Sequence, residues 1–261
     1  MGITVMARID NYEQRFGGIA RLYTPDGLAR LRQAHICVIG IGGVGSWVVE
    51  ALARSGVGEL TLIDMDDICV TNINRQLPAM SGTIGKLKTE VMSERVKLIN
   101  SECTVNIIDD FISPENQSDY LNRGYDYVID AIDNVKTKAS LIAYCKRNKI
   151  NVITIGGAGG QTDPTQIQIA DLSKTIQDPL LAKVRSVLRK DYNFSQNPKR
   201  KFSIDAIFST QPLIFPQMTE DCSISATMNC ANGFGAATMI TATFGFFAVS
   251  RVIDKLLKKK S

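Results

Sequence analysis

The stretch HICVIGIGGVGSW (35–47) joins an apolar run to a glycine-rich turn and continues into a helical pattern. It contains the pattern G-x-G-x-x-G. In this pattern the first glycine makes the turn, the second lets the backbone approach phosphate oxygens, and the last lets helix and strand pack closely. The glycines of the turn are Gly40, Gly42, Gly43 and Gly45. Amide groups at the start of the helix then face an anion. The stretch predicts a nucleotide-binding strand–turn–helix unit; a tight turn without any nucleotide is the alternative.

Apolar runs and helical patterns alternate through the first half of the chain, which is typical of a doubly wound α/β fold with a parallel sheet. Strands are predicted at 35–40, 59–64, 104–111, 125–132 and 151–156. Helices are predicted at 45–55, 86–100, 114–122 and 135–148. We therefore expect a Rossmann-like, mostly parallel sheet whose core covers residues 12–160.

The pattern changes after residue 157, and we interpret residues 161–261 as a C-terminal extension of the same sheet within one domain, 1–261. The extension combines two strands, a helix and a long apolar stretch. These lie at 166–172, 202–209, 178–192 and 233–253. The apolar stretch has the length of a marginal membrane span, and membrane association through it is one alternative. Its glycines, threonines and alanines favour a helix buried in the core or in a dimer interface.

Composition indicates an ordinary globular protein of 261 residues, with 44% hydrophobic residues and a formal net charge of +4. Lysine and arginine concentrate at 197–202 and 255–260, which allows binding of a polyanion without demonstrating it. The six cysteines form no Cys-x-x-Cys pair, and His35 is the one histidine. A zinc site of the usual spacing is therefore not expected. The scattered thiols favour a reducing, cytoplasmic environment.

Asp64 ends the second predicted strand, 24 residues after Gly40. A carboxylate at this place can accept hydrogen bonds from both ribose hydroxyls of a nucleotide. A nicotinamide cofactor and ATP both contain such a ribose, so Asp64 does not distinguish them. A solvated acid at a strand end is the alternative.

The segment 70–90 distinguishes a triphosphate from a dinucleotide. Its polar and cationic candidates are Asn72, Asn74, Arg75, Gln76, Lys86 and Lys88. ATP needs such residues because fixed cations must neutralise its β and γ phosphates and the charge that develops at the α phosphorus. Surface charge is the alternative for Arg75. The solvated first turn of a helix is the alternative for the lysines, although cations disfavour a helix N-terminus.

A second polar cluster, Asp130, Asp133 and Asn134, follows the strand predicted at 125–132. Ligands of open parallel sheets bind at the carboxyl ends of the strands, so we expect this cluster to face the crevice of the glycine turn. One carboxylate there can hold Mg²⁺ against the phosphates. Capping of the following helix is the alternative for Asp133 or Asn134.

Four motifs, GIGGVGS (40–46), NINRQ (72–76), GKLK (85–88) and DAIDN (130–134), together resemble the family of ubiquitin-activating-type adenylyltransferases. The resemblance covers roughly residues 12–160 and preserves the order and spacing of all four motifs. It implies a homodimer that uses ATP and Mg²⁺, with attack of a substrate carboxylate on the α phosphorus to give an acyl-adenylate. It also allows a structural monovalent cation.

The resemblance implies roles for particular residues. Asp64 is similar to the ribose-binding acid of the family, and Asp133 to its Mg²⁺-associated acid. Asn72, Arg75 and Lys88 are similar to the residues that bind phosphate and stabilise charge in the reaction.

Arg15 resembles the arginine that dimers of the family lend across the interface, with Arg21 as its rival. Lys88 is preferred over Lys86 as the catalytic lysine.

Family members that activate small sulfur-carrier proteins hold zinc between two Cys-x-x-Cys pairs, which this sequence lacks.

The second half of the chain is similar to a branch of the family that acts on tRNA. The similar stretches are 156–180, 208–217 and 232–248. This branch activates the threonine carboxylate of a threonylcarbamoyl-modified adenosine beside the anticodon and closes a ring with loss of water. The nucleophile is already tethered to the carboxylate, so a high effective molarity replaces a second substrate. We expect Cys222 and Cys230 to be structural or incidental, with capture of the acyl group as the alternative.

The expected partner is tRNA, whose backbone would meet the basic clusters 184–190, 198–201 and the terminal lysines. The resemblance also suggests a link to a cysteine desulfurase and its acceptor protein. Two alternatives remain open. One is adenylation of the C-terminal carboxylate of a small sulfur-carrier protein. The other is an NAD-dependent dehydrogenase or a non-catalytic scaffold, which leaves Arg75, Lys88 and Asp133 unexplained.

Overall fold

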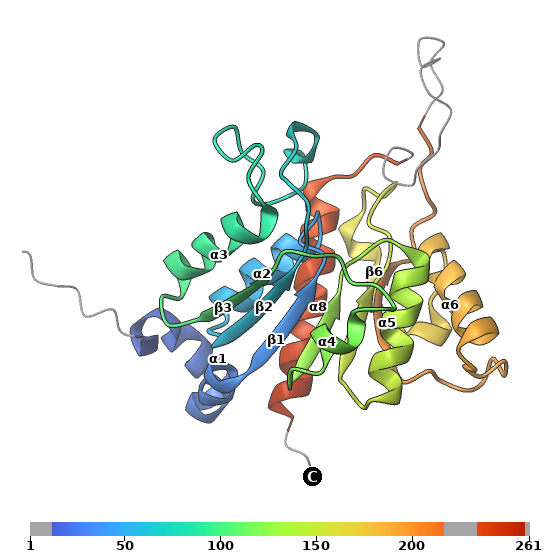
Figure 1. Ribbon diagram of the computed structural model, residues 1–261, viewed down its shortest axis with the longest axis horizontal. Helices are drawn as coiled ribbons and strands as arrows, with labels where there is room; N and C mark the ends of the chain where they lie inside the picture. Colours follow the sequence, from blue (N-terminus) through green and yellow to red (C-terminus); the bar gives the residue numbers. More distant parts are fainter. Residues whose placement is uncertain (1–11, 217–233, 259–261) are drawn as a thin grey trace, which may run out of the picture.

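One sheet of seven strands organises the residues that the computed structural model describes, 12–216 and 234–258. The strand order is β3-β2-β1-β4-β5-β7-β6, and neighbours are parallel except for β6 with β7 (Figure 1). The strands are β1 (His35–Ile39), β2 (Glu59–Ile63), β3 (Thr104–Ile108), β4 (Tyr127–Asp130), β5 (Val152–Ile155), β6 (Ile167–Asp171) and β7 (Asp205–Ser209). The predicted α/β fold with a mostly parallel sheet is confirmed, and β6 and β7 attach the extension to that sheet.

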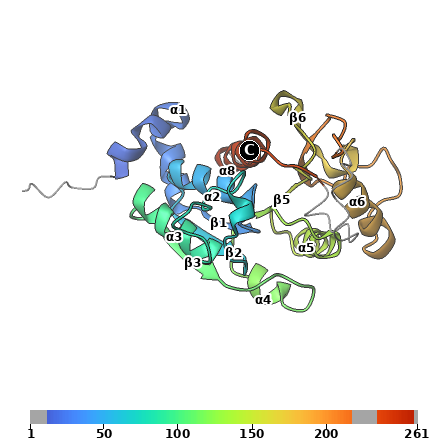
Figure 2. The same cartoon turned by 90° about the horizontal axis from the view of Figure 1, so that it is seen from above.

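Helices cover both faces of the sheet (Figure 2). They are α1 (Tyr12–Gln33), α2 (Gly45–Arg54), α3 (Lys88–Ile99), α4 (Gln117–Leu121), α5 (Val135–Arg147), α6 (Pro179–Asp191) and α8 (Thr238–Leu257). Short 3-10 turns lie at Val70–Asn72, Pro164–Gln166 and Leu172–Lys174. On one face α2 packs against α8, and on the other α5 packs against α6.

Strand β1 illustrates how the two faces are filled. Ile36 and Val38 belong to the core shared with α2 and α8, while Cys37 and Ile39 belong to the core shared with α5 and α6. All four side chains are at most 1% exposed. Because both faces of the sheet are covered, the strand is a continuous apolar run instead of an alternating one.

The order in which the chain adds strands to the sheet reverses between β1 and β4. The chain moves from β1 outward to β2 and β3, and then returns to β4 on the other side of β1. In open α/β sheets the ligand crevice lies outside the carboxyl ends of the strands at such a switch point. The loops after β1, β2 and β4 therefore mark the expected site, beneath the lobe of residues 65–87 that rises above the sheet in Figure 1.

Two helices depart from the sequence-based expectation. Helix α1 was not predicted, and its pattern is interrupted because Thr24 adopts a φ of 70° before Pro25. Helix α8 runs from Thr238 to Leu257 instead of over 233–253, and beyond the apolar stretch its residues Leu256 and Leu257 still pack against the core. The other predicted strands and helices are confirmed with ends shifted by at most three residues.

Helix α8 buries one side against the sheet and α2. Ile240, Phe244, Ala248 and Val252 on this side are fully buried. Among the described residues, no helix combines the length and the apolar character needed to cross a membrane.

Candidate functional site

The glycine turn connects β1 to α2 in a conformation that requires glycine. Gly40 has a φ of +86°, in the left-handed region that favours glycine. A side chain on Gly45 would place its Cβ only 1.7 Å from the Gly40 carbonyl oxygen, so helix and turn touch directly. Helix α2 begins here without a side-chain cap. The start of a helix without such a cap can bind an anion such as a phosphate.

Asp64 stands directly after β2, beside the glycine turn. Its Oδ2 accepts a hydrogen bond from the Ile41 N–H at 2.6 Å, and its Oδ1 accepts one from the Asp66 N–H at 2.9 Å. Burial raises the pKa of the Asp64 carboxyl, while the nearby Lys88 charge lowers it. The backbone bonds fix the orientation of the carboxylate, and its remaining lone pairs can accept ribose hydroxyls.

Lys88 begins α3 and is buried next to two acids of the crevice. Its Nζ lies 2.7 Å from Asp66 Oδ2 and 3.9 Å from Asp64 Oδ1. The two carboxylates offset the cost of placing a cation at a helix N-terminus. Lys86 is exposed, and its carbonyl accepts a hydrogen bond from the Ile68 N–H. The structure therefore brings Lys88 to the crevice.

The segment after the 3-10 turn lies against the glycines. The Cγ and Cδ of Arg75 come within 3.4 Å of where a Cβ on Gly43 would stand, and Nε2 of Gln76 lies 4.0 Å from that position on Gly42. Gln76 is buried, and its Oε1 has no hydrogen-bond partner in the described residues. An unpartnered buried oxygen is costly, so a polar group in the crevice would stabilise it. Arg75 and Gln76 thus lie against the glycine turn.

Local hydrogen bonds hold this segment in shape. Asn72 Oδ1 accepts from the Cys69 N–H at 3.0 Å and so stabilises the 3-10 turn. Arg75 Nη1 donates to the Thr71 carbonyl at 2.9 Å and to Asn74 Oδ1 at 3.0 Å. In this geometry Asn72 shapes the loop, while the rest of the Arg75 guanidinium remains available for an anion.

The start of α8 makes hydrogen bonds to the segment that carries Asn74 and Arg75. This contact with the C-terminal extension was not predicted from the sequence. Thr238 Oγ1 donates to the Asn74 carbonyl at 2.6 Å, and Asn74 Nδ2 donates to the Ala236 carbonyl at 2.7 Å. Gly245 lets α8 approach α2, because a Cβ there would stand 3.0 Å from the Val44 carbonyl oxygen. The extension therefore supports the nucleotide side of the crevice.

The loop after β4 separates three residues that the sequence grouped together. Asp133 is exposed and lines the crevice. Asn134 caps α5, since its Oδ1 accepts from the Thr137 N–H at 3.1 Å, as the capping alternative predicted, and it lines the crevice beside Asp133 as well. The expectation that Asp130 faces the crevice is wrong. It is fully buried and pairs with Lys138 at 2.9 Å because an ionised carboxylate inside the core requires a buried cation.

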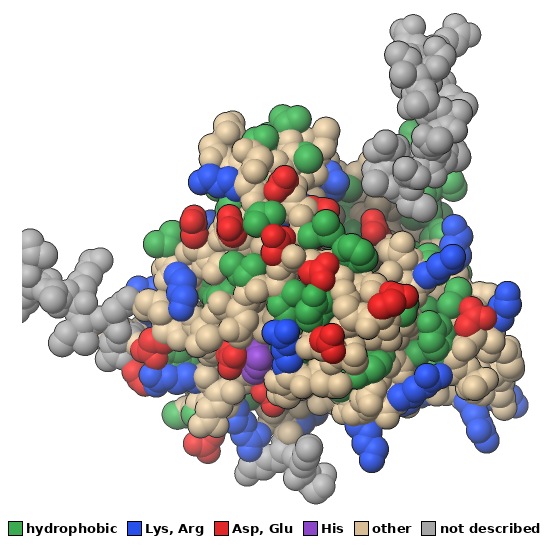
Figure 3. Space-filling view, viewed as in Figure 1, with side chains coloured by type: hydrophobic (Ala, Val, Ile, Leu, Met, Phe, Trp, Pro, Cys, Tyr) green, Lys and Arg blue, Asp and Glu red, His purple; other side chains and the backbone are tan. Residues whose placement is uncertain are grey.

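A cavity of about 350 Å³ lies between these loops. Its lining includes four carboxylates, from Asp64, Asp66, Asp110 and Asp133. Sequence reasoning did not single out Asp110, although its place just beyond β3 is the signal that pointed to the other acids. Hydrogen bonds led by the Tyr120 hydroxyl hold the pKa of Asp110 below its usual range. The band of acidic side chains beneath the protruding lobe is visible in Figure 3.

Arg15 lies away from this cavity. Its Nη1 donates to the carbonyls of Leu98 and Ile99, at the end of α3 opposite to Lys88. The helix spans twelve residues, so its two ends are about 16 Å apart. Arg21, its rival, lies on the same helix beside Gly17. The structure brings neither arginine into the crevice of its own chain.

The family model of the ThiF family matches residues 17–261, and the chain therefore belongs to the ThiF family. It is 97% identical over 261 residues to the tRNA threonylcarbamoyladenosine dehydratase of Haemophilus influenzae, with 100% of both chains covered. Crystal structures of the E. coli dehydratase TcdA give the same fold. The AMP complex has 56% identity, a TM-score of 0.88 and coverage of 96% and 97% of the two chains. The ATP complex has 55% identity, a TM-score of 0.88 and coverage of 96% of each.

These findings confirm the resemblance predicted from the four motifs and favour the branch named for tRNA. They do not favour the carrier-protein alternative. The dehydrogenase alternative is also not favoured, because the matched E. coli structures hold AMP and ATP.

Proposed function

We propose that this chain catalyses the ATP-dependent dehydration of N6-threonylcarbamoyladenosine at position 37 of tRNA, which closes the threonine side chain into a ring. The observation that carries the proposal is the 97% identity to the H. influenzae dehydratase along the whole chain, extension included. The crevice supports it, because its glycine turn and cationic segment suit a triphosphate. A homologue with 55% identity is known in complex with ATP.

In this proposal ATP occupies the crevice at the switch point. Asp64 accepts the ribose hydroxyls, and the start of α2 faces the phosphates. Arg75, Gln76 and Lys88 contact the phosphates and the charge that develops during transfer. Asn72 contributes by shaping the loop that carries them.

Mg²⁺ fits the residues present. The cavity carries four carboxylates, which would repel a bare triphosphate, and the Asn134 side chain also lines it. Oxygen donors are what Mg²⁺ prefers, and it is commonly held by one or two carboxylates together with substrate phosphates. Among residues 12–216 and 234–258, no three His, Cys, Asp or Glu side chains form a metal site of their own. Asp133 would hold the ion, which when bound neutralises charge on the phosphates.

The reaction requires the threonine carboxylate to gain a leaving group. A carboxylate oxygen bonds to a phosphorus of ATP, whose own leaving group departs. A nitrogen or oxygen of the same side chain then attacks the carbonyl carbon, and the C–O bond to the phosphorylated oxygen breaks. The nucleophile loses a proton, so the nucleoside loses one water overall. The tether between the reacting groups supplies the effective concentration.

Two buried cysteines are poorly suited to form a covalent intermediate. Burial raises the pKa of the Cys103 and Cys145 thiols to about 12, which keeps both protonated. Cys69 is exposed on the segment that leads to the 3-10 turn. Cys222 and Cys230 lie outside the described residues.

We further propose that the chain is a single domain acting as a cytoplasmic homodimer in which Arg15 serves the crevice of the partner. A structural monovalent cation and a link to a cysteine desulfurase and its acceptor belong to the same proposal. The proposed homodimer is tested by mixing two inactive variants of the chain. Arg15→Ala and Asp133→Ala chains, each inactive alone, should regain about a quarter of wild-type activity after exchange, because half of the dimers then hold one intact site. No recovery would contradict a shared site.

The proposed function is tested with tRNA that carries the modified adenosine. The chain is incubated with this tRNA, ATP and Mg²⁺. The tRNA is then digested to nucleosides, and their masses are measured by mass spectrometry. A nucleoside lighter by one water, formed only with ATP, supports the proposal. Transfer of a nucleotide to a small carrier protein, with the tRNA unchanged, would contradict it.

A further inference from the structure

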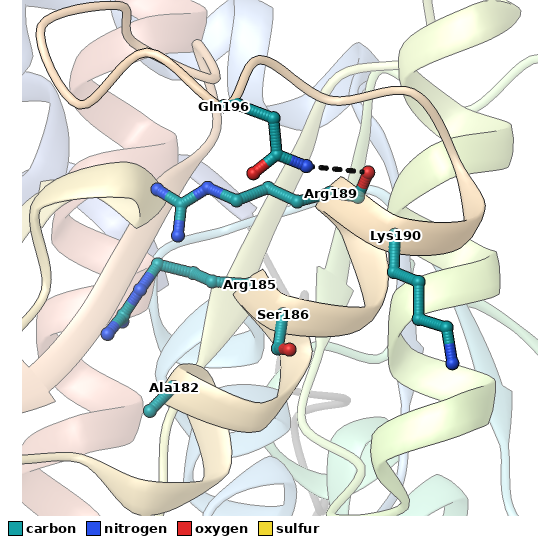
Figure 4. Close-up of a pocket in the computed structure, with 6 residues that line it drawn as sticks. All are labelled: Ala182, Arg185, Ser186, Arg189, Lys190 and Gln196. Atoms are coloured by element: carbon teal, nitrogen blue, oxygen red, sulfur yellow. Dashed lines mark hydrogen bonds between the residues drawn. The ribbon is translucent and has the colours of Figure 1, made fainter.

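A second cavity, of about 370 Å³, lies on α6, away from the crevice. Polar and basic side chains dominate its lining (Figure 4). The lining residues are Ala182, Arg185, Ser186, Arg189, Lys190 and Gln196. Figure 4 shows Arg185 and Arg189 pointing to the same side of α6, with Gln196 next to Arg189, while Lys190 points to the other side.

Contacts with neighbouring residues hold both arginines in place. They lie one helical turn apart on α6, so their side chains are neighbours. Arg185 Nη1 donates to the Thr175 hydroxyl. Arg189 Nε donates to the Ser195 carbonyl at 3.4 Å, and its guanidinium lies 5.3 Å from the centre of the Phe202 ring. Each side chain is partly buried and oriented before any ligand arrives.

Neither of these two arginines is directly paired with a carboxylate in the part of the chain that the structure describes. Among the described residues, the ion pairs involve other lysines and arginines and include neither Arg185 nor Arg189. Burial and the charge of Arg189 lower the pKa of Arg185, while the Asp178 carboxylate, which forms no ion pair with it, opposes this in part. Two cations held side by side without a directly paired carboxylate repel each other, and an anion between them would reduce this cost.

The chemistry of the lining favours a phosphate group of a polynucleotide. Guanidinium groups bind phosphate oxygens through paired N–H bonds. The lining contains no aromatic ring on which a base could stack. Positive charge continues in the exposed residues Lys199, Arg200 and Lys201, and Lys174 Nζ holds their segment by donating to the Pro198 carbonyl at 2.6 Å. Figure 3 shows lysine and arginine side chains spread over the side of α5 and α6. A chain of phosphates suits such a row of charges better than one free ion does.

The cavity also lies within reach of the crevice. Helix α6 starts at the carboxyl edge of the sheet, where its cap Asp178 accepts a hydrogen bond from the Gly157 N–H at 2.9 Å. Arg185 follows seven residues later, about 10 Å along the helix axis. The arginines thus lie on a helix that begins at the same edge of the sheet as the crevice.

We propose that Arg185 and Arg189 form a binding site for a backbone phosphate of tRNA, independent of base sequence. The inference rests on the proposed function, since it specifies how that substrate is held. Binding of this type releases counter-ions, so its affinity falls with salt in proportion to the number of phosphates contacted.

The test compares Arg185→Gln/Arg189→Gln with the matched control Lys183→Gln/Lys146→Gln, which removes two positive charges from exposed positions outside the cavity. Affinity for labelled tRNA is measured by fluorescence anisotropy over a series of salt concentrations, and affinity for ATP is measured alongside. The arginine variant should bind tRNA about tenfold more weakly, with the slope of log K against log salt reduced by about one, because one phosphate contact is lost. ATP affinity should not change, which also shows that the variant is folded. Arg185→Lys/Arg189→Lys should restore the salt slope.

Several results would overturn the proposal. One is tRNA affinity and salt slope in the arginine variant equal to those of the control. Another is tight binding of inorganic phosphate that depends on Arg185, with tRNA binding unaffected, because it would assign the cavity to a free ion. In both cases wild-type dehydration persists and the proposed function stands. A wild-type chain that neither binds nor converts tRNA would instead remove the proposed function together with the site.

Discussion

Replacement of Lys138 by methionine probes how the loop beside the nucleotide is supported. Lys138 and Asp130 are both fully buried, and their Nζ and Oδ2 atoms are 2.9 Å apart. Removing one partner of a buried pair costs about 3–5 kcal/mol, because the remaining charge lacks both water and counter-ion. This corresponds to a fall in Tm of about 6–20 °C for a domain of this size. Lys138 Nζ also donates to the Ile132 carbonyl at 2.7 Å, directly before Asp133, so the KM for ATP should rise as well.

The loss of stability in Lys138→Met should depend on pH. Burial already raises the pKa of Asp130, and removal of the Lys138 charge raises it further. The folded variant then binds a proton more tightly than the unfolded chain, so the penalty is largest at high pH and shrinks as the pH falls toward the ordinary carboxyl range. Urea unfolding followed by circular dichroism, at about pH 8 and about pH 5.5, measures this relative to the wild type.

A double variant completes this experiment. Asp130→Asn combined with Lys138→Met removes both charges and should recover most of the lost stability, because the uncompensated carboxylate is gone. A single-variant loss below about 1 kcal/mol would refute the reasoning. A loss that is equal at both pH values and is not relieved in the double variant would refute it too.

Three further predictions concern the crevice. Asp133→Ala should stay folded and bind ATP but lose turnover, and wild-type rates would exclude Asp133 from the mechanism. Arg75→Ala should cost about 3 kcal/mol in the transition state, the scale of one lost charge-stabilising donor, and a kcat/KM reduced less than tenfold would make it a surface charge. Gly45→Ala should abolish ATP binding in calorimetry, because its Cβ would stand 1.7 Å from the Gly40 carbonyl oxygen, whereas Gly82→Ala, with open space around it, should bind normally. Equal ATP affinity in the two glycine variants would contradict that reading of the turn.

Local patterns were sufficient to predict most of the fold. The β1–α2 unit depends on neighbours in sequence, and the covered sheet makes each inner strand a continuous apolar run. Helix α1 escaped prediction because Thr24 and Pro25 interrupt its periodicity, while burial of Phe16 and Leu28 in tertiary contacts holds both halves in place.

The site was predictable where a residue follows directly from a strand end. Asp64 and Asp133 were found in this way. Asp130 was placed incorrectly because its partner Lys138 lies in the first turn of the next helix, and a sequence does not show which cation folds back onto which acid. The clamp of Thr238 on the Asn74 carbonyl joins positions 164 residues apart, and no local pattern reports such a contact.

The central claim is that ATP activates the threonine carboxylate of the modified nucleoside. It is tested most directly with tRNA whose carboxylate carries a heavy-oxygen label, followed by mass analysis of the phosphorus-containing products. The account predicts one labelled oxygen per turnover on the AMP or phosphate released, which also shows which phosphorus is attacked. Label released as water, or retained in full in a ring-closed nucleoside, would contradict activation of the carboxylate by ATP.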